Sequence, residues 1–287
     1  MGGNIFKDHA SPIARENIRP TLEKYVAHLE YIFPEKAHVF KNFFPVGSVG
    51  KKLVSGDMDL ALDFKHLFEG KPYNSEELQQ FRVSPIEWET LYKKIKLRAR
   101  TSTDEMCKLK AFLKLLTYPV CSEGMIHVAG DKTTHGNIFS MFPQYDRHGQ
   151  TNKYVQIDWM IGNLPWLKFA YHSGESGGYL KGLHRTQLMV AMLSEKGYTF
   201  IHLKGIKNKI TQEFVATTPK EAIGLFNQLF GDFIEDDFYD FITLHHFLRK
   251  YSPEGEYRKI VNSYLRILKT SRASIPSVLE EFENENT

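Results

Sequence analysis

Two carboxylates stand two residues apart in the segment Asp57–Met58–Asp59. From residue 57 to 64, the acids fall at odd positions and the bulky apolar residues at even positions, which predicts a strand with one face in the core. Positions two apart on a strand share a face and lie about 7 Å apart, so both carboxylates can hold a pair of divalent cations spaced by ~3.5–4 Å. Mg²⁺ or Mn²⁺ suits such oxygen ligands. We therefore expect two metal ions at Asp57 and Asp59.

A short turn upstream of this strand has the composition of a phosphate site. Val46–Gly47–Ser48 is separated from Asp57 by eight residues. A Gly–Ser turn offers backbone N–H groups and a hydroxyl to phosphate oxygens, because oriented amides form an anion-binding concavity. Lys51 and Lys52 add positive charge beside it. We expect Gly47, Ser48, Lys51 and Lys52 to bind a nucleotide.

A third carboxylate lies in the otherwise apolar predicted strand 154–161. Asp158 is a carboxylate in the middle of a core strand, which costs free energy unless it is paired, hydrogen-bonded or bound to metal. Two-metal phosphoryl transfer usually needs such a third ligand. Asp57 and Asp59 alone also fit the exposed edge of a strand, but together with the Gly–Ser turn and Asp158 they favour an active site.

These motifs resemble the nucleotidyltransferase superfamily of DNA polymerase β. Its pattern is an apolar residue, Gly, then Gly or Ser, a spacer, Asp-x-Asp, and a later Asp on a neighbouring strand. The match spans roughly residues 20–165 and is most similar to the template-independent branch, which includes CCA-adding enzymes, poly(A) polymerases and cGAS-like synthases. Segment 181–185 resembles small phage-type nucleotidyltransferases. Relatives that add CCA often carry Arg and Thr where this chain has Lys51, Lys52 and Leu53, so the subfamily stays open.

The resemblance implies a fold, a reaction and roles for the motif residues. Asp57 and Asp59 would bind both metals, Asp158 would bind the catalytic metal and activate the attacking hydroxyl, and Gly47 and Ser48 would contact the triphosphate. The fold would be α/β (α+β), with a mixed-sheet nucleotidyltransferase domain at 1–165 and a mostly helical C-terminal domain at 166–287 as the other wall of the cleft. The expected substrate is a nucleoside triphosphate (NTP), and the first acceptor to test is an RNA 3′ end.

Three alternatives remain open for the function. The acceptor could be another nucleotide, giving a cyclic or oligomeric product, or it could be a small molecule or a protein side chain. The chain could also be a catalytically inactive relative that binds RNA or a partner protein. Labelled products and RNA-binding measurements separate these cases.

Basic residues outside the motifs have two interpretations each. Lys181, His184 and Arg185 stand at a predicted helix start, where the helix dipole favours phosphate, and they fit a solvated helix end equally well. The densest basic stretch, 93–100 with lysines at 108, 110 and 114, can follow a nucleic-acid backbone or form a solvated helix face. Lysines 204, 207 and 209, on a predicted hairpin turn, have the same two interpretations.

Periodicity and capping patterns predict the remaining elements. Helices are expected over 20–33, from Ser84–Pro85 to about 98, from Asp104 to about 117, over 182–193, from Thr218–Pro219 to Gly231, and from 252–253 to about 270. Strands are expected over 39–46, 125–129, 138–145, 154–161, 198–203 and 213–216, with a hairpin turn at 146–150. Residues 1–19 are interpreted as an arm and 271–287 as an acidic tail.

Composition excludes several classes of protein. The chain of 287 residues is 42% hydrophobic and 25% charged, which is typical of a globular protein rather than a disordered one. Two cysteines, at 107 and 121, exclude a disulfide framework and a four-thiolate zinc site, and favour a reduced, cytoplasmic setting. The sequence has no secretion signal at its start and no apolar stretch near ~20 residues, so no membrane partner is expected. A net charge of +3 is too small to indicate nucleic-acid binding by itself, and it says nothing of oligomeric state.

Overall fold

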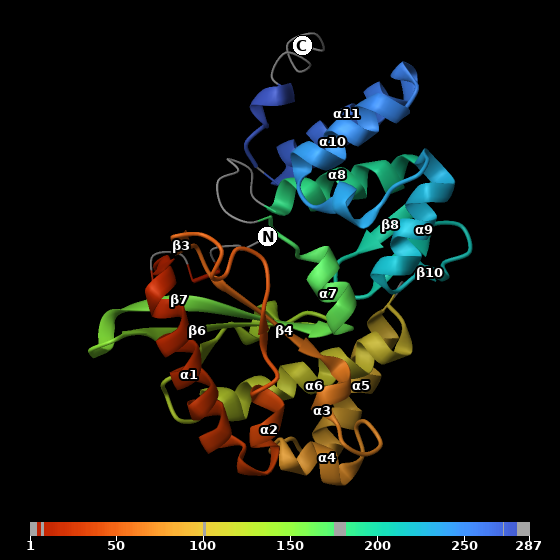
Figure 1. Cartoon of the computed structure of the whole chain (residues 1–287). Helices are drawn as coiled ribbons and strands as arrows, with labels where there is room; N and C mark the ends of the chain where they lie inside the picture. Colours follow the sequence, from red (N-terminus) through yellow and green to blue (C-terminus); the bar gives the residue numbers. More distant parts are fainter. Residues whose placement is uncertain (1–4, 7–8, 100–101, 175–181, 272, 280–287) are drawn as a thin grey trace. The chain divides into compact units, whose positions relative to one another are not determined.

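The computed structural model describes residues 5–6, 9–99, 102–174, 182–271 and 273–279 (Figure 1). The chain divides into two compact units, Met1–Leu167 and Lys168–Thr287. Each unit has its own sheet and its own helices, so the molecule is a mixed α/β protein.

The first unit contains a five-stranded mixed sheet in the order β2-β4-β7-β6-β5. Its strands are β2 (Phe44–Pro45), β4 (Met58–Asp63), β5 (His127–Val128), β6 (Asn137–Asp146) and β7 (Gly149–Gly162). The β4 and β7 strands run parallel, and the other neighbours are antiparallel. A separate two-stranded pair joins β1 (Ile13–Ala14) to β3 (Val54–Ser55). The predicted hairpin is confirmed, with longer strands and a tighter turn than expected, because Asp146 already pairs with Gly149.

Helices α1 (Arg15–Ile32), α2 (Ala37–Phe40) and α6 (Asp104–Cys121) pack on the apolar face of this sheet (Figure 1). The unit also contains α3 (Phe64–Leu67), α4 (Ser75–Gln80), α5 (Pro85–Arg98), most of α7 (Leu164–Ala170), and the 3₁₀ turns η2 (Pro34–Lys36) and η3 (Gly130–Lys132). A buried polar cluster fixes α1 on the sheet: the Trp159 indole N–H donates to the Tyr25 hydroxyl at 2.6 Å, and that hydroxyl lies 2.8 Å from the Ser140 hydroxyl. These bonds fix the orientation of the Trp159 side chain on the core-facing side of β7.

The second unit combines helices with a three-stranded antiparallel sheet. Its strands are β8 (Tyr198–Ile201), β9 (Gly205–Asn208) and β10 (Phe214–Ala216), in the order β10-β9-β8. Helix α8 (Gly182–Glu195) packs against α10 (Phe241–Tyr251) and α11 (Glu254–Ser271). The remaining elements are α9 (Pro219–Phe230), η4 (Glu235–Phe238) and η5 (Ser277–Leu279). At α9, Thr218 and Glu221 form the predicted capping box, and Gly231 ends the helix.

Three predictions about local structure are wrong. The supposed N-terminal arm already forms β1 and the first turns of α1. The aromatic run 39–46 contains the end of a helix and only a two-residue strand, since Val39 and Phe40 are buried from the helical turn α2. The basic segment 204–209 is largely strand β9 rather than a hairpin turn. Helix α6 begins at Asp104 as predicted, with the Thr103 side chain as its cap, and it continues to Cys121, beyond the predicted end near 117.

Candidate metal and nucleotide site

The pairing of β4 with β7 brings two of the predicted aspartates together. In the parallel register, Asp59 lies directly beside Asp158. Their neighbours Met58, Leu60 and Trp159 point to the opposite face, where they join the hydrophobic core. Because side chains alternate along a strand, this core-facing set places both carboxylates on the other face of the sheet.

Asp57 completes a cluster of three carboxylates. One oxygen from each of Asp57, Asp59 and Asp158 lies within 4.8 Å of the other two. Asp59 and Asp158 are only 7% and 2% exposed, whereas Asp57 is half-buried at the start of the strand. The Oδ1 atom of Asp59 has no hydrogen-bond partner among the described residues. An unpartnered buried carboxylate oxygen beside two more carboxylates suits a divalent cation, so the donor set fits Mg²⁺ or Mn²⁺.

Burial and like charge both disfavour ionisation in this cluster. Burial, with a further contribution from the charge of Asp57, raises the pKa of Asp59 to about 7. Burial likewise raises the pKa of Asp158 to about 8, and the charges of Asp59 and Asp57 add to it. Gln156 opposes part of this effect, because its side-chain amide donates to both oxygens of Asp158 at 2.9 and 3.1 Å. A bound cation would reverse the balance and favour the ionised forms.

The Gly–Ser turn lies against this cluster. Gly47 has φ +65°, and a Cβ atom at this position would lie 2.7 Å from Oδ2 of Asp59. The backbone N–H of Val46 donates to the carbonyl oxygen of Asp59 at 2.9 Å. Glycine is therefore required here both for its left-handed backbone and for the close approach of the turn to the carboxylate.

Contacts with Arg15 and Ser55 fix the part of the turn that comes after Gly47 in the chain. The Ser55 hydroxyl and the backbone N–H of Lys51 both donate to the Ser48 carbonyl, each at 3.1 Å. The Arg15 guanidinium donates to the carbonyl oxygens of Lys51 and Lys52. Ser48, Lys51 and Lys52 thus sit on a turn that is fixed from two sides and that begins at the carboxylate cluster.

The three other residues predicted to bind nucleotide, at positions 181, 184 and 185, belong to a different part of the chain. Lys181 lies outside the described residues. His184 and Arg185 are each 2% exposed, inside the second unit. Nδ1 of His184 lies 2.8 Å from the Tyr264 hydroxyl, and Arg185 donates to the backbone carbonyls of Phe238 and Phe169. These contacts give His184 and Arg185 a packing role inside the second unit. This role is neither of the two predicted ones, which were phosphate binding and a solvated helix end.

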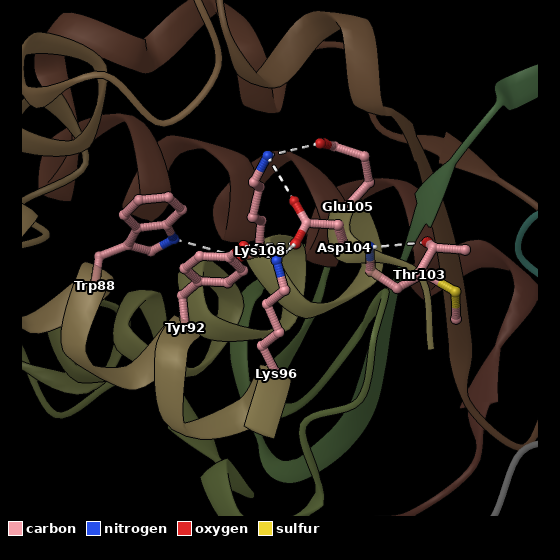
Figure 2. Close-up of polar contacts among 8 residues, drawn as sticks. Trp88, Tyr92, Lys96, Thr103, Asp104, Glu105 and Lys108 are labelled. Atoms are coloured by element: carbon pink, nitrogen blue, oxygen red, sulfur yellow. Dashed lines mark hydrogen bonds and ion pairs between the residues drawn. The ribbon is translucent and has the colours of Figure 1, made fainter. Parts of the chain in front are cut away.

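Ion pairs engage part of the basic stretch on α5 and α6. Figure 2 shows Lys96 and Lys108 converging on Asp104, at 2.6 and 3.0 Å. The Tyr92 hydroxyl donates to the same carboxylate, and Lys108 also pairs with Glu105 at 2.9 Å. Hydrogen bonds from Lys96, Tyr92 and Lys108 hold the pKa of Asp104 well below its usual range. The positive charges of Lys96 and Lys108, predicted to face nucleic acid or solvent, are thus balanced within the helix pair.

Two lysines of the basic segment in the second unit have contacts other than ion pairs. Nζ of Lys209 donates to the carbonyl and hydroxyl oxygens of Ser194, at 3.0 and 2.9 Å. Nζ of Lys204 lies 4.7 Å from the centre of the Phe214 ring. Both contacts fix these lysines within the second unit.

Two residues near the site have roles that the sequence patterns did not indicate. Asp63, at the end of β4, caps α3 by accepting the backbone N–H of Lys65, and it also accepts the backbone N–H of Leu164, the first residue of α7. Gln156 contacts Asp158 directly. Its position two residues before Asp158 on a predicted strand is a signal that could have placed both on one face.

The comparisons with known proteins leave the site to be judged on its own geometry. No family model and no curated protein matches the chain. Among the described residues, no helix is both long enough and apolar enough to span a membrane. The described residues contain three aspartates that can hold a divalent metal, next to a tight glycine turn.

Proposed function

We propose that this chain is a metal-dependent nucleotidyltransferase, which moves a nucleoside monophosphate from an NTP to an acceptor hydroxyl without a template. One observation carries the proposal: Asp57, Asp59 and Asp158 converge within 4.8 Å while the Gly47 turn approaches Asp59. Three carboxylates next to a turn that can bind phosphate are what phosphoryl transfer by metal ions requires.

The residues divide the work between metal binding, phosphate binding and proton transfer. Asp57, Asp59 and Asp158 would hold Mg²⁺ or Mn²⁺, and the metal supplies Lewis acidity that activates the acceptor hydroxyl and neutralises the pyrophosphate that leaves. The turn at Gly47 and Ser48, with Lys51 and Lys52, would orient the triphosphate. Asp158 would also accept the proton of the attacking hydroxyl, because the bound metal keeps its carboxylate ionised and able to act as a base.

The test is transfer of label from nucleoside triphosphates. The purified protein is incubated with each of the four α-³²P-labelled NTPs, Mg²⁺ or Mn²⁺, and total small RNA, and products are separated by gel and thin-layer chromatography. Label on RNA would establish a terminal transferase and identify its nucleotide. Label on a small product or on the protein would keep the proposed site and change the acceptor.

Matched variants connect the activity with the site. The double variant Asp57→Asn/Asp59→Asn should reduce incorporation by at least about 1,000-fold, because each substitution removes a charged ligand of the metal. Asp131→Asn changes an aspartate whose side chain is 74% exposed and should leave incorporation unchanged. Equal incorporation by the double variant and the unchanged protein would contradict the proposal. Tight RNA binding with no incorporation under any metal would instead favour the inactive, RNA-binding alternative.

A further inference from the structure

Gln156 is a buried amide with a partner on each side. It lies on β7, is 2% exposed, and its Nε2 atom is 2.9 and 3.1 Å from the two oxygens of Asp158. Its Oε1 atom accepts the backbone N–H of Ile5 at 3.0 Å. The side chain therefore connects the backbone of Ile5 to the carboxylate cluster.

The contact with Ile5 determines which way the amide points. A carboxylate only accepts hydrogen bonds and a backbone N–H only donates. If the Gln156 amide were rotated by 180°, its oxygen would face the Asp158 carboxylate and its NH₂ group would face the Ile5 N–H, so both contacts would become repulsive. The N–H of Ile5 thus holds the donor of Gln156 against Asp158.

A second buried glutamine contacts the backbone of residues 11 and 12 and has no hydrogen bond to the aspartates among those the structure describes. Gln144, on β6, is also 2% exposed. Its Nε2 atom donates to the carbonyl oxygens of Ser11, Pro12 and Tyr154, at 3.1, 3.2 and 3.1 Å. It offers a control with the same side chain, the same burial and the neighbouring strand.

We infer that Gln156 is a positioning residue, which fixes the carboxylate of Asp158 for metal binding and is itself fixed by the backbone of Ile5. This inference rests on the proposed function of the Asp57, Asp59 and Asp158 cluster. Groups that hydrogen-bond to a metal ligand restrict its orientation, and their loss typically weakens metal binding by about 10–100-fold. The backbone of Ile5 is then part of the support of the metal site.

Mn²⁺ binding to the whole protein, measured by calorimetry and by electron paramagnetic resonance without nucleotide, tests the inference. Gln156→Leu keeps the size of the side chain and removes its polar atoms, and it should weaken Mn²⁺ binding about 10–100-fold. Gln144→Leu loses buried hydrogen bonds to Ser11, Pro12 and Tyr154 rather than to Ile5 or Asp158, so it should weaken Mn²⁺ binding several-fold less than Gln156→Leu does. Equal Mn²⁺ affinity of Gln156→Leu and the unchanged protein would overturn the inference and leave the proposed function intact.

A second pair of variants tests the link to Ile5, first in the otherwise unchanged protein and then together with Gln156→Leu. Ile5→Pro removes the backbone N–H, whereas Ile5→Ala retains it. Ile5→Pro should weaken Mn²⁺ binding several-fold more than Ile5→Ala does, and should add nothing in a Gln156→Leu background, because both changes act on one contact chain. Equal affinities of the two Ile5 variants would overturn the link. Mn²⁺ binding that Asp158→Asn does not weaken would overturn both the inference and the proposed site.

Discussion

At the scale of single residues, Asp59 combines features that cost stability. Its carboxylate is buried, lies beside two other carboxylates, and has an oxygen without a hydrogen-bond partner among the described residues. None of the described ion pairs involves Asp59 or Asp158. Such an arrangement is typical of functional sites, where strain is retained because the charge is needed for a ligand.

Asp59→Asn should therefore stabilise the metal-free protein while it abolishes metal binding. The substitution removes one buried negative charge at nearly constant volume, and the new amide can donate to a neighbouring carboxylate, so we expect a gain of about 1–3 kcal/mol in the free energy of unfolding at pH 8. Urea unfolding with a chelator present measures it. Asp131→Asn, at an exposed site, should stay within about 0.5 kcal/mol. A loss of stability in Asp59→Asn would mean that the cluster is structural.

At the scale of elements, the turn between β2 and β3 offers two glycines that differ in one respect. Gly47 and Gly50 have φ +65° and +75°, so a side chain at either position costs about 1–2 kcal/mol of backbone strain. Only at Gly47 would a Cβ collide with Asp59, at 2.7 Å from Oδ2, whereas nothing lies within 4 Å of a Cβ at Gly50.

Gly47→Ala and Gly50→Ala separate backbone strain from displacement of the carboxylate. Both variants should lose a similar 1–2 kcal/mol in urea unfolding, on the order expected for alanine at positive φ. Gly47→Ala should in addition weaken Mn²⁺ binding at least about tenfold, because Asp59 must move, while Gly50→Ala should bind like the unchanged protein. Similar Mn²⁺ affinities for the two variants would show that the turn does not act on the metal site.

Elements were predictable from sequence wherever a local signal agreed with the tertiary environment. Helix α5 begins and ends as predicted, because Ser84 caps it and Pro85 occupies its first turn. Strand β4 forms where its alternating pattern predicts it and its even positions enter the core, although the face that carries Asp59 is buried as well. The run 39–46 misled the prediction because its aromatic residues favour strands locally, yet Phe40 packs against Phe33 and Trp159 from a helix.

The site was predictable for its acids and less so for its supporting groups. Asp57, Asp59 and Asp158 follow from spacing and from the cost of a carboxylate in a core strand. The packing roles of His184 and Arg185 depend on partners 16 to 80 residues away, which no local pattern encodes. The bond between Gln156 and Ile5 spans 151 residues and is likewise hidden from local reasoning.

At the scale of the whole molecule, the negative charge of the site contrasts with the charge of the chain. The net charge is +3, from 37 basic and 34 acidic residues, yet three carboxylates gather within 4.8 Å in the first unit. Attraction of a cation to this point is therefore local, and it depends on ionisation of Asp59 and Asp158. Proton binding and metal binding must compete there.

This competition gives opposite pH dependences to two quantities: the free energy of unfolding of the metal-free protein and the additional stabilisation that a bound metal provides. The pKa values of Asp59 and Asp158 are raised to about 7 and about 8, above those of an unfolded chain, so the folded protein binds more protons between about pH 4 and pH 8. Without metal, the free energy of unfolding should fall by on the order of 5 kcal/mol from pH 5 to pH 8.5 through these two groups. With Mn²⁺ present, the added stabilisation should grow over the same range, because the metal binds the ionised carboxylates.

Urea unfolding at several pH values, with Mn²⁺ or with a chelator, measures both trends. The double variant Asp59→Asn/Asp158→Asn serves as the reference, so that titration of the histidines cancels in the difference. This difference should slope downward with pH in chelator and should disappear below about pH 4, where the carboxyls are protonated in both folded and unfolded chains. A difference that does not change with pH would show that the two carboxyls ionise as they do in water, and that the cluster holds no strained charge for a metal to relieve.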